Sequence, residues 1–538
     1  MSRKKELIFL FIILIIAGFF RLWQLDKIPP WLFPDVAMNG NDAWETLKNV
    51  NFKVFYPENN GREGLMIWLI VFSFLIFGVS VWSIKIVAAI FGTLTVLGLY
   101  LLTKELFNNN QNNRAIALLS SFFLAISFWH TNFSRLGFRA ILLPFVLVFS
   151  FYFLFKGFNS LQKNNQHFYQ TSLKFLGAGL FFGLGFYTYT SFRMAVLILP
   201  FIFIPYWFVS KKENLQKEFF LHTFSFLLIV FIVALPLGIY FLSHPQDFIG
   251  RATPISIFAK ENPLKEFAKS LILHLAMFNV YGDPNFRHNL AGSPMIFWPI
   301  GILFLFGLFY ATYQLIKNFK IQQINILNFW LFLFLISWWF IMLLPGILTY
   351  EGIPHALRTI GVIPPVFILS GLAGYKIYQL FNQNTINKKL LIFTCFLFLA
   401  SLLFSEYNKY FNLWAKNEKI DEAFGKKYAQ IGYFLNSLPD GAKKYVIIDT
   451  PNNPLYGISI DAQTPIFIER TKFKDKRAEY INFRDLEKID LSQRIDLSQK
   501  EIIILPLYED NIFQELFSKF PQGQIKIENN LKYYYLTK

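Results

Sequence analysis

Residues 219–242 read FFLHTFSFLLIVFIVALPLGIYFL, a stretch of 24 residues without a charged side chain. A helix needs about 20 mostly apolar residues to cross the hydrocarbon core of a bilayer, so this stretch predicts a membrane-spanning helix. Ten further apolar runs of similar length begin near Leu7, Trp82, Ala115, Ala140, Ser172, Met194, Met295, Ile326, Arg358 and Leu390. The sequence therefore predicts a polytopic α-helical membrane protein with about 11–13 spans.

The composition of the chain supports this class. Of its 538 residues, 54% are apolar, 16% are charged and 67 are Phe. A soluble globular domain carries about 45–50% apolar and about 25% charged residues, so the composition excludes a water-soluble enzyme, a disordered chain and a fibrous repeat. Cys395 is the only cysteine, which excludes an intrachain disulfide, a Cys-based zinc site and an iron–sulfur cluster.

The distribution of basic residues sets the predicted orientation. Residues 1–406 hold 31 basic and 16 acidic side chains, whereas residues 407–538 hold 20 and 18. A basic excess in a membrane region reflects the positive-inside rule, so we expect the lipid bilayer and not a nucleic acid as the partner. With the N-terminus in the cytoplasm, the segments predicted inside carry 16 basic and four acidic residues. We therefore predict a multi-pass protein of the plasma (cytoplasmic) membrane with a cytoplasmic N-terminus.

Two apolar segments need separate interpretation. The first run follows Arg3, Lys4 and Lys5 and resembles a signal peptide, but no small-residue cleavage site follows it, so we expect a retained anchor. Residues 65–78 are shorter than the other runs. Counting them as a full span would reverse every later loop and put the lysine-rich loops outside. We therefore predict an interfacial or re-entrant segment at residues 65–78.

Arginine predominates on the predicted outer side, where 8 of 14 basic residues are Arg. Guanidinium groups suit bidentate contact with phosphate or carboxylate, although snorkelling to lipid headgroups can explain any single one. Two long outer loops, residues 24–80 and 243–293, lie on the same side. Taken together, the outer arginines predict an anionic ligand on the outer face. They are Arg21, Arg62, Arg135, Arg139, Arg193, Arg251, Arg287 and Arg358.

Residues 407–538 are predicted to form a separate soluble α/β domain outside the membrane, following a membrane domain of residues 1–406. The composition of the tail shifts to Lys, Asp, Glu and Asn. Hydrophobic periodicity predicts helices at residues 424–438 and 511–520 and strands at residues 444–449, 501–505 and 532–536. We find no catalytic motif in this tail.

The first outer loop holds the strongest catalytic candidate. Residues 29–45 read PPWLFPDVAMNGNDAWE, so prolines and aromatics precede Asp35 just before a predicted short helix. An Asp at this place can cap the helix. At a membrane surface among arginines it can also act as a general base. The position of Asp35 in the sequence does not decide between a helix cap and a general base.

The stretch around Asp35 resembles a motif of a known protein family. Residues 34–43 (PDVAMNGNDA) look like the first-loop acidic motif of glycosyltransferases with the multi-span C-type fold, in the family 39 group of protein O-mannosyltransferases and the lipid A aminoarabinose transferase. Further similar stretches are FYPENNGREG (55–64), FSRLGFR (133–139), GFYTYTSFR (185–193), GDPNFRHN (282–289) and EGIPHALR (351–358). The resemblance covers roughly residues 1–400. One departure is Val36, since the family commonly has Asp-Glu where this chain has Asp35-Val36.

The resemblance implies transfer of a sugar from a polyprenyl-phosphate donor to an acceptor hydroxyl, with Asp35 as the base and inversion at the anomeric carbon. The phosphate leaving group requires charge stabilisation and no general acid. We expect Arg358, Arg135 and Arg193 to bind it, with His355 and Arg287 behind them. Further substrate-binding candidates are Asp42, Glu58, Arg62, Glu63, Tyr187, Tyr189, His288 and Glu351. No cofactor is expected to be required. Asp283, Glu351 and His355 could bind a divalent metal, but their spacing matches no metal motif, so no metal site is predicted.

Alternatives remain at this stage. A carrier or flippase for lipid-linked sugars would place charges near the bilayer midplane, whereas these spans contain few. A non-catalytic relative that binds lipid-linked sugar stays open because of Val36. Another enzyme that uses the same donor class is a third alternative. The catalytic interpretation requires Asp35 to face the arginines across a cavity reachable from both lipid and water.

Overall fold

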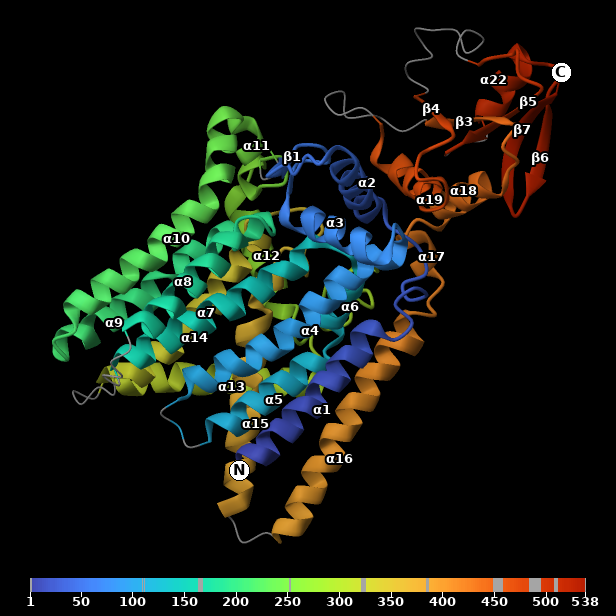
Figure 1. Ribbon diagram of the computed structural model, residues 1–538. Helices are drawn as coiled ribbons and strands as arrows, with labels where there is room; N and C mark the ends of the chain where they lie inside the picture. Colours follow the sequence, from blue (N-terminus) through green and yellow to red (C-terminus); the bar gives the residue numbers. More distant parts are fainter. Residues whose placement is uncertain are drawn as a thin grey trace. The chain divides into compact units, whose positions relative to one another are not determined.

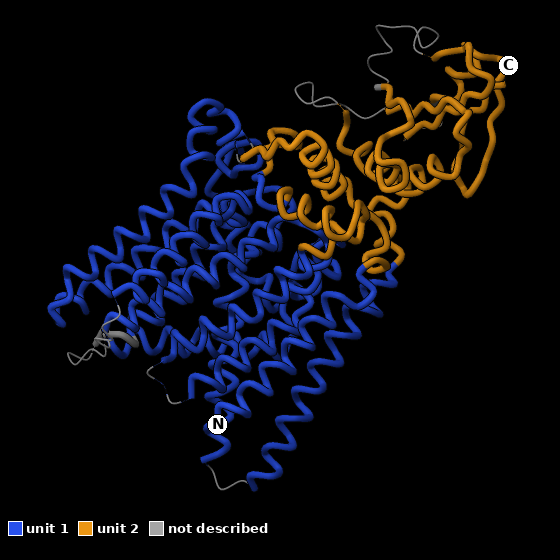
Figure 2. The backbone as a smooth tube through the Cα atoms, in the orientation of Figure 1, with its two compact units in different colours: residues 1–25, 63–66, 88–417 blue, residues 26–62, 67–87, 418–538 orange. Residues whose placement is uncertain are grey.

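The computed structural model describes residues 2–108, 110, 112–162, 168–250, 253–320, 326–383, 387–448, 458–482, 495–507 and 511–537 (Figure 1). The chain forms two compact units, coloured separately in Figure 2. Unit 1 comprises Met1–Leu25, Glu63–Met66 and Ala88–Asn417, and unit 2 comprises Asp26–Arg62, Ile67–Val87 and Glu418–Lys538. Most of the first outer loop therefore belongs to the same unit as the C-terminal tail. The predicted division of the chain at residue 407 stays a prediction.

Unit 1 is a bundle of long apolar helices. Its helices are α1 (Arg3–Leu22), most of α4 (Val81–Leu106), α5 (Asn113–Ile126), α6 (Phe128–Leu136), η1 (Arg139–Ile141), α7 (Leu142–Gln162), α8 (Phe168–Gly185), η2 (Thr190–Ile198), α9 (Pro200–Lys212), α10 (Gln216–Ser243), α11 (Pro245–Ile249), η3 (Ile257–Ala259), α12 (Pro263–Ala276), α13 (Trp298–Lys320), α14 (Ile326–Ile347), η4 (Ile360–Val362), α15 (Ile363–Gln383), α16 (Lys388–Tyr407) and η5 (Asn408–Trp414). Each of the eleven predicted runs is helical in the structure.

The number of membrane spans depends on how α1, α8 and the bent pair of α5 and α6 are counted. Among the described residues, eight helical segments are long and apolar enough to cross a membrane, and α5 with α6 makes a ninth if their bend of 56° lies within one span. Two predicted spans are not among these nine. The helix α1 begins with the charged residues 3–6, and α8 begins with mostly polar residues. The structure thus confirms the polytopic helical class, and the orientation in the membrane stays a prediction.

Small residues let two of these helices approach closely. Gly179 and Gly183, four residues apart on α8, face α10. A Cβ atom added at Gly179 would lie 2.6 Å from the carbonyl oxygen of Phe226. Such contacts drive association where lipid tails are as apolar as the side chains. This packing explains how α8 joins the bundle despite its polar start.

The short segment predicted at residues 65–78 is the helix α3 (Leu65–Phe77), with 13 residues. At 1.5 Å per residue it is roughly 20 Å long, whereas the hydrocarbon core is about 30 Å thick. The helix is therefore too short for a full span, in keeping with the interfacial or re-entrant prediction.

Unit 2 contains the α/β fold predicted for the tail. Its elements are α2 (Pro34–Asn49), β1 (Phe55–Tyr56), most of α3, α17 (Lys419–Ala423), α18 (Lys426–Ser437), β3 (Lys443–Ile448), η6 (Ile460–Ala462), α19 (Gln463–Phe473), β4 (Glu479–Asn482), β5 (Glu501–Pro506), α22 (Asn511–Lys519), β6 (Gln524–Glu528) and β7 (Leu531–Thr537); the short strand β2 (Arg62–Glu63) pairs with β1. The five-stranded sheet has the order β4-β3-β5-β7-β6. Neighbours β4, β3 and β5 run parallel, and β7 runs antiparallel to both β5 and β6.

The alternation of side chains along the strands divides this sheet into two apolar faces. Val446 and Ile503 pack with α18 and α19 on one face, whereas Ile447 and Ile504 pack with α22 on the other. A strand buried on both faces reads as a continuous apolar run, which is why the tail strands could be located from the sequence.

The first outer loop packs onto this α/β layer within unit 2. The Arg470 guanidinium on α19 donates to Asn41 Oδ1 on α2 at 2.9 Å, and Thr464 Oγ1 donates to the carbonyl oxygen of Leu32 at 3.1 Å. Trp31 Nε1 donates to Asp421 Oδ1 at 2.6 Å. These bonds fix the start of α2, which carries Asp35.

Candidate functional site

Asp35 lies in the first turn of α2, directly after Pro34. Its side chain is half-buried, and Asn59 Nδ2 donates to Asp35 Oδ1 at 2.9 Å. A carboxylate at a helix N-terminus is stabilised by the helix dipole. Val36 is only 1% exposed and belongs to the apolar core. The position at which the family commonly has Glu is therefore a packing position in this chain.

Within unit 2, Arg62 contacts two other predicted substrate-binding residues, Asp42 and Glu58. One of its terminal nitrogens lies 2.6 Å from Asp42 Oδ2 and 3.8 Å from Glu58 Oε2, and the other donates to Asn39 Oδ1 at 3.0 Å. The Arg62 side chain is almost fully buried. Burial raises the pKa of Asp42, while the adjacent guanidinium acts in the opposite direction. These contacts hold the segment after α2 in place. They also pair the Arg62 guanidinium with carboxylates of the same unit.

A second ion pair lies in unit 1, where Glu63 meets Arg139. The Nε atom of Arg139 lies 3.1 Å from Glu63 Oε2, and Thr190 Oγ1 donates to Glu63 Oε1 at 3.1 Å. The Arg139 guanidinium also stacks on the Tyr189 ring, 5.4 Å from its centroid. Both charged side chains are largely buried. The structure thus brings together three stretches that the sequence predicts on one side of the membrane.

Tyr187, in the same turn as Tyr189, is buried. Its hydroxyl donates to the carbonyl oxygen of Val233 on α10 at 2.9 Å. Burial raises the pKa of this phenol. The side chain therefore ties the turn after α8 to α10.

Arg358 precedes η4 and α15 at a partly open position. Its guanidinium donates to Thr349 Oγ1 at 2.9 Å and to the carbonyl oxygen of Glu351 at 2.7 Å. The Glu351 carboxylate lies 3.8 Å away and is 62% exposed, whereas the Arg358 side chain is 14% exposed. Ser191 Oγ donates to the carbonyl oxygen of Arg358 at 2.9 Å. This arginine is thus fixed by its backbone and still borders solvent.

The other predicted phosphate ligands have different surroundings. Arg135 is fully buried and donates to the carbonyl oxygens of Phe20, Trp23 and Gln24 at 2.9, 2.7 and 3.1 Å. Arg193 donates to the carbonyl oxygen of Phe248 at 2.6 Å and stacks on its ring. These geometries favour roles in holding the chain for Arg135 and Arg193. The remaining outer arginines are Arg21, buried against His130, Arg287, whose Nε donates to Asn285 Oδ1, and Arg251, which lies outside the described residues.

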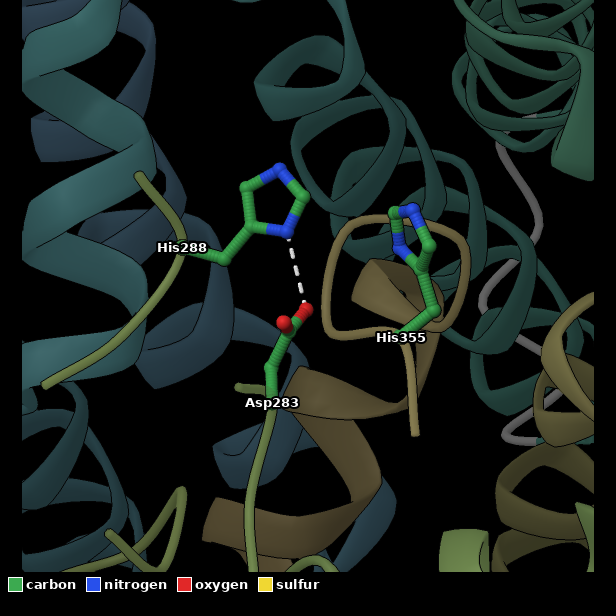
Figure 3. A group of neighbouring side chains, drawn as sticks. All are labelled: Asp283, His288 and His355. Carbon is green, nitrogen blue, oxygen red and sulfur yellow. Dashed lines mark hydrogen bonds and ion pairs between the residues drawn. The ribbon is translucent and has the colours of Figure 1, made fainter. Parts of the chain in front are cut away.

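Asp283, His288 and His355 form a cluster (Figure 3). The sequence suggested Asp283 and His355 as possible ligands together with Glu351, but the structure places His288 with them and Glu351 beside Arg358. The ring nitrogen Nδ1 of His288 lies 2.8 Å from Asp283 Oδ2. The two imidazole rings have centroids 5.0 Å apart. One ligand atom from each of the three residues lies within 4.8 Å of the others. Asp and His are ligands that divalent transition metals accept, so this cluster can hold a metal ion.

The backbone around the cluster is fixed by His274 on α12. Its Nδ1 lies 2.8 Å from the carbonyl oxygen of Ser270, and the backbone N–H of His355 donates to its Nε2 at 3.2 Å. Burial lowers the pKa of His274 to about 4. A neutral ring with its proton on Nδ1 satisfies both bonds, which positions His355 beside Asp283.

Sequence reasoning missed three partners. Asn59 lies in an Asn-Asn-Gly turn that could have suggested a polar partner for Asp35. Arg139 is the second arginine of FSRLGFR, and no signal identified Glu63 as its partner. Asp283 and His288 are five residues apart, a spacing without a recognised motif. Asp35 belongs to unit 2 and the predicted phosphate ligands belong to unit 1, so their meeting stays a prediction.

Unit 1 also contains a cavity of about 500 Å³. Its lining includes Glu105, Asn159, Tyr206, Trp330 and Lys376. None of the predicted site residues lines this cavity. The cavity that the catalytic interpretation requires beside Asp35 therefore stays a prediction.

Comparisons with known proteins bear on this arrangement. Residues 65–240 match the model of a family described as dolichyl-phosphate-mannose-protein mannosyltransferase. The structure of ArnT from Cupriavidus metallidurans bound to undecaprenyl phosphate matches 99% of this chain and 98% of its own, with 12% identity and a TM-score of 0.60. The apo Archaeoglobus fulgidus oligosaccharyltransferase matches 100% of this chain and 75% of its own, with 14% identity and a TM-score of 0.53. A comparison with curated protein sequences finds no match. The chain thus has the C-type glycosyltransferase fold that the sequence predicts.

Proposed function

We propose that this chain is an integral-membrane glycosyltransferase that moves a sugar from a polyprenyl-phosphate donor to an acceptor hydroxyl on the extracytoplasmic face. The observation that carries the proposal is the similarity over nearly the full length of both chains to the ArnT structure, which has undecaprenyl phosphate bound. The family match at residues 65–240 supports the same class of donor. The donor's lipid would lie in the bilayer and its phosphate at the outer surface.

In this proposal Asp35 takes the proton of the acceptor hydroxyl. Its position supports the role, because the carboxylate is half-buried and its orientation is set by Asn59 at 2.9 Å. The leaving phosphate is already anionic and requires a positive charge where negative charge develops. Arg358 is the best-placed candidate of unit 1 because it is fixed and borders solvent. Attack opposite the phosphate would invert the anomeric centre.

The remaining predicted residues take supporting roles in this proposal. Arg287 would add positive charge on the same outer face, whereas Arg193 would hold the segment around Phe248. The pairs Arg62–Asp42 and Arg139–Glu63 would hold the segment that leads into α3. Arg135 would hold the end of α1. The acceptor stays unidentified.

The test uses membranes that contain the full chain, incubated with a panel of polyprenyl-phosphate sugars. Mass spectrometry follows the release of polyprenyl phosphate, which reports transfer whatever the acceptor is. We expect Asp35→Asn to lower turnover by ~10²–10⁴-fold, the usual contribution of a general base. The matched control is Asp26→Asn, which removes an exposed carboxylate from the same loop and should leave turnover unchanged.

Three outcomes would contradict the proposal. Turnover of Asp35→Asn equal to that of the wild type would exclude Asp35 as the base. Binding of donor without release of polyprenyl phosphate from any sugar would favour a non-catalytic relative. Movement of intact donor between leaflets without release would favour a carrier. NMR of the product's anomeric proton would test inversion separately.

A further inference from the structure

We propose that Asp283, His288 and His355 bind a divalent transition-metal ion, for which zinc is the best-suited candidate, and that this ion joins the second long outer loop to the loop before η4. The residues come from two segments about 70 residues apart in the sequence, yet their ligand atoms lie within 4.8 Å of one another. Figure 3 shows the two imidazole rings turned toward each other and toward the Asp283 carboxylate. The proposal is independent of the proposed glycosyl transfer.

The donor set fits zinc. Two imidazole nitrogens and one carboxylate oxygen are ligands that zinc accepts at about 2.0–2.2 Å, in a tetrahedron with a fourth position open to water or an anion. Softer ions prefer thiolates, and harder ions such as magnesium prefer oxygen ligands only. The chain's one cysteine, Cys395, lies in α16 and is not part of this cluster.

The surroundings orient the ligands in the way that metal sites require. Asp283 Oδ1 accepts the N–H of Asn285 at 2.8 Å, and Asp283 Oδ2 accepts the N–H of Ala356 at 2.8 Å. The His288 ring packs against Phe133, with centroids 5.5 Å apart. Such partners fix the orientation of ligands around bound metals.

Burial also favours the site. Asp283 is 1% exposed and His288 is 4% exposed. The competing interpretation is that Asp283 and His288 only form an ion pair, which would stabilise the second long outer loop without a metal. The backbone bonds to His274 and Asp283 bring His355 beside this pair, and a shared ion would in addition bind all three side chains, which the Asp283–His288 ion pair alone does not do. Metal binding of this kind adds directly to the stability of the folded state.

The experiment measures metal content in the full chain purified in detergent. The chain is treated with EDTA, freed of EDTA, given zinc chloride and passed over a desalting column. We expect one zinc ion per chain and a higher melting temperature than that of the stripped chain. His288→Ala and His355→Ala should each reduce zinc to background. His244→Ala, which removes an exposed histidine from the end of α10, should retain it.

Cobalt binding to the wild-type chain provides a second readout that requires no variant. A tetrahedral site gives intense visible absorption of Co²⁺, which added zinc should abolish. Zinc content of the wild type equal to that of the His288→Ala, His355→Ala double variant would overturn the proposal, as would the absence of that absorption. Neither readout depends on glycosyl transfer, so the failure of one proposal is distinguishable from failure of the other.

Discussion

Arg135 and Arg358 carry the same sequence signal, an arginine near the outer end of a predicted span, but they have different environments within unit 1. Arg135 is fully buried, and its guanidinium donates to three carbonyl oxygens at the end of α1. Arg358 is partly exposed and donates to the loop around Thr349 and Glu351. The position in the sequence does not distinguish these two cases, whereas the acceptors of each guanidinium do.

The difference has a simple electrostatic origin. The last carbonyl groups of a helix lack intrahelical partners and carry partial negative charge. A buried guanidinium beside the end of α1 therefore satisfies groups that would otherwise remain unpaired in an apolar environment. The Glu351 carboxylate, 3.8 Å from the Arg358 guanidinium, is largely exposed. Arginines that satisfy helix ends support the fold, and arginines that border solvent can exchange part of their contacts for a ligand.

The largest effect on stability is expected for Arg135→Gln. The shorter amide cannot reach all three carbonyl oxygens, and each buried polar group left unpaired costs about 1–3 kcal/mol. We expect the variant to lose folded, monodisperse protein in detergent, measured by size-exclusion chromatography and thermal unfolding. Arg135→Lys keeps the charge but not the fork of donors, so it should be intermediate.

A wild-type melting temperature for Arg135→Gln would contradict the structural role of Arg135. In that case its guanidinium would return as a candidate phosphate ligand, and the contrast with Arg358 would disappear. Comparing the melting temperatures of Arg135→Gln and Arg135→Lys separates the effect of losing the positive charge from the effect of losing the planar set of donors.

An intermediate effect is expected for the pair Arg139 and Glu63. Removing one partner of a buried ion pair leaves the other charge uncompensated and typically costs about 3–5 kcal/mol. Arg139→Met and Glu63→Gln should each lower the free energy of unfolding in mixed micelles. The double variant should recover part of the loss, because no charge then remains buried. Additive losses in the double variant would show that the two side chains do not stabilise each other.

The helical class and the tail could be predicted from the sequence because both depend on local pattern. Uninterrupted apolar runs located the long helices, and buried strands such as β3 and β5 read as continuous apolar stretches. The association of α2 with α19 could not be predicted, since it depends on polar contacts between residues more than 400 positions apart, such as Arg470 with Asn41.

The candidate site could be predicted only in part. Asp35 was identified because a motif marks it, and Glu351 with Arg358 lie in one short stretch. The partnership of Glu63 with Arg139 depends on tertiary packing of segments far apart in the sequence. The cluster of Asp283, His288 and His355 forms because His274 fixes one loop against another. Contacts of this kind depend on how distant segments pack in three dimensions, and the spacing of residues along the sequence does not reveal that packing.

The smallest effect on stability is expected for Arg358→Gln, because its partner carboxylate is exposed and such pairs contribute about 0–1 kcal/mol. If Arg358 stabilises the leaving phosphate, kcat should nevertheless fall by ~10²–10³-fold, the usual cost of removing one such donor. The control is Arg477→Gln, which breaks a more exposed pair with Asp440 in unit 2 and should change neither quantity. A melting temperature that falls as far as that of Arg135→Gln, with kcat preserved, would place Arg358 among the arginines that support the fold. An unchanged melting temperature with a reduced kcat would instead sharpen the distinction, because the same side chain would then affect transfer without affecting folding.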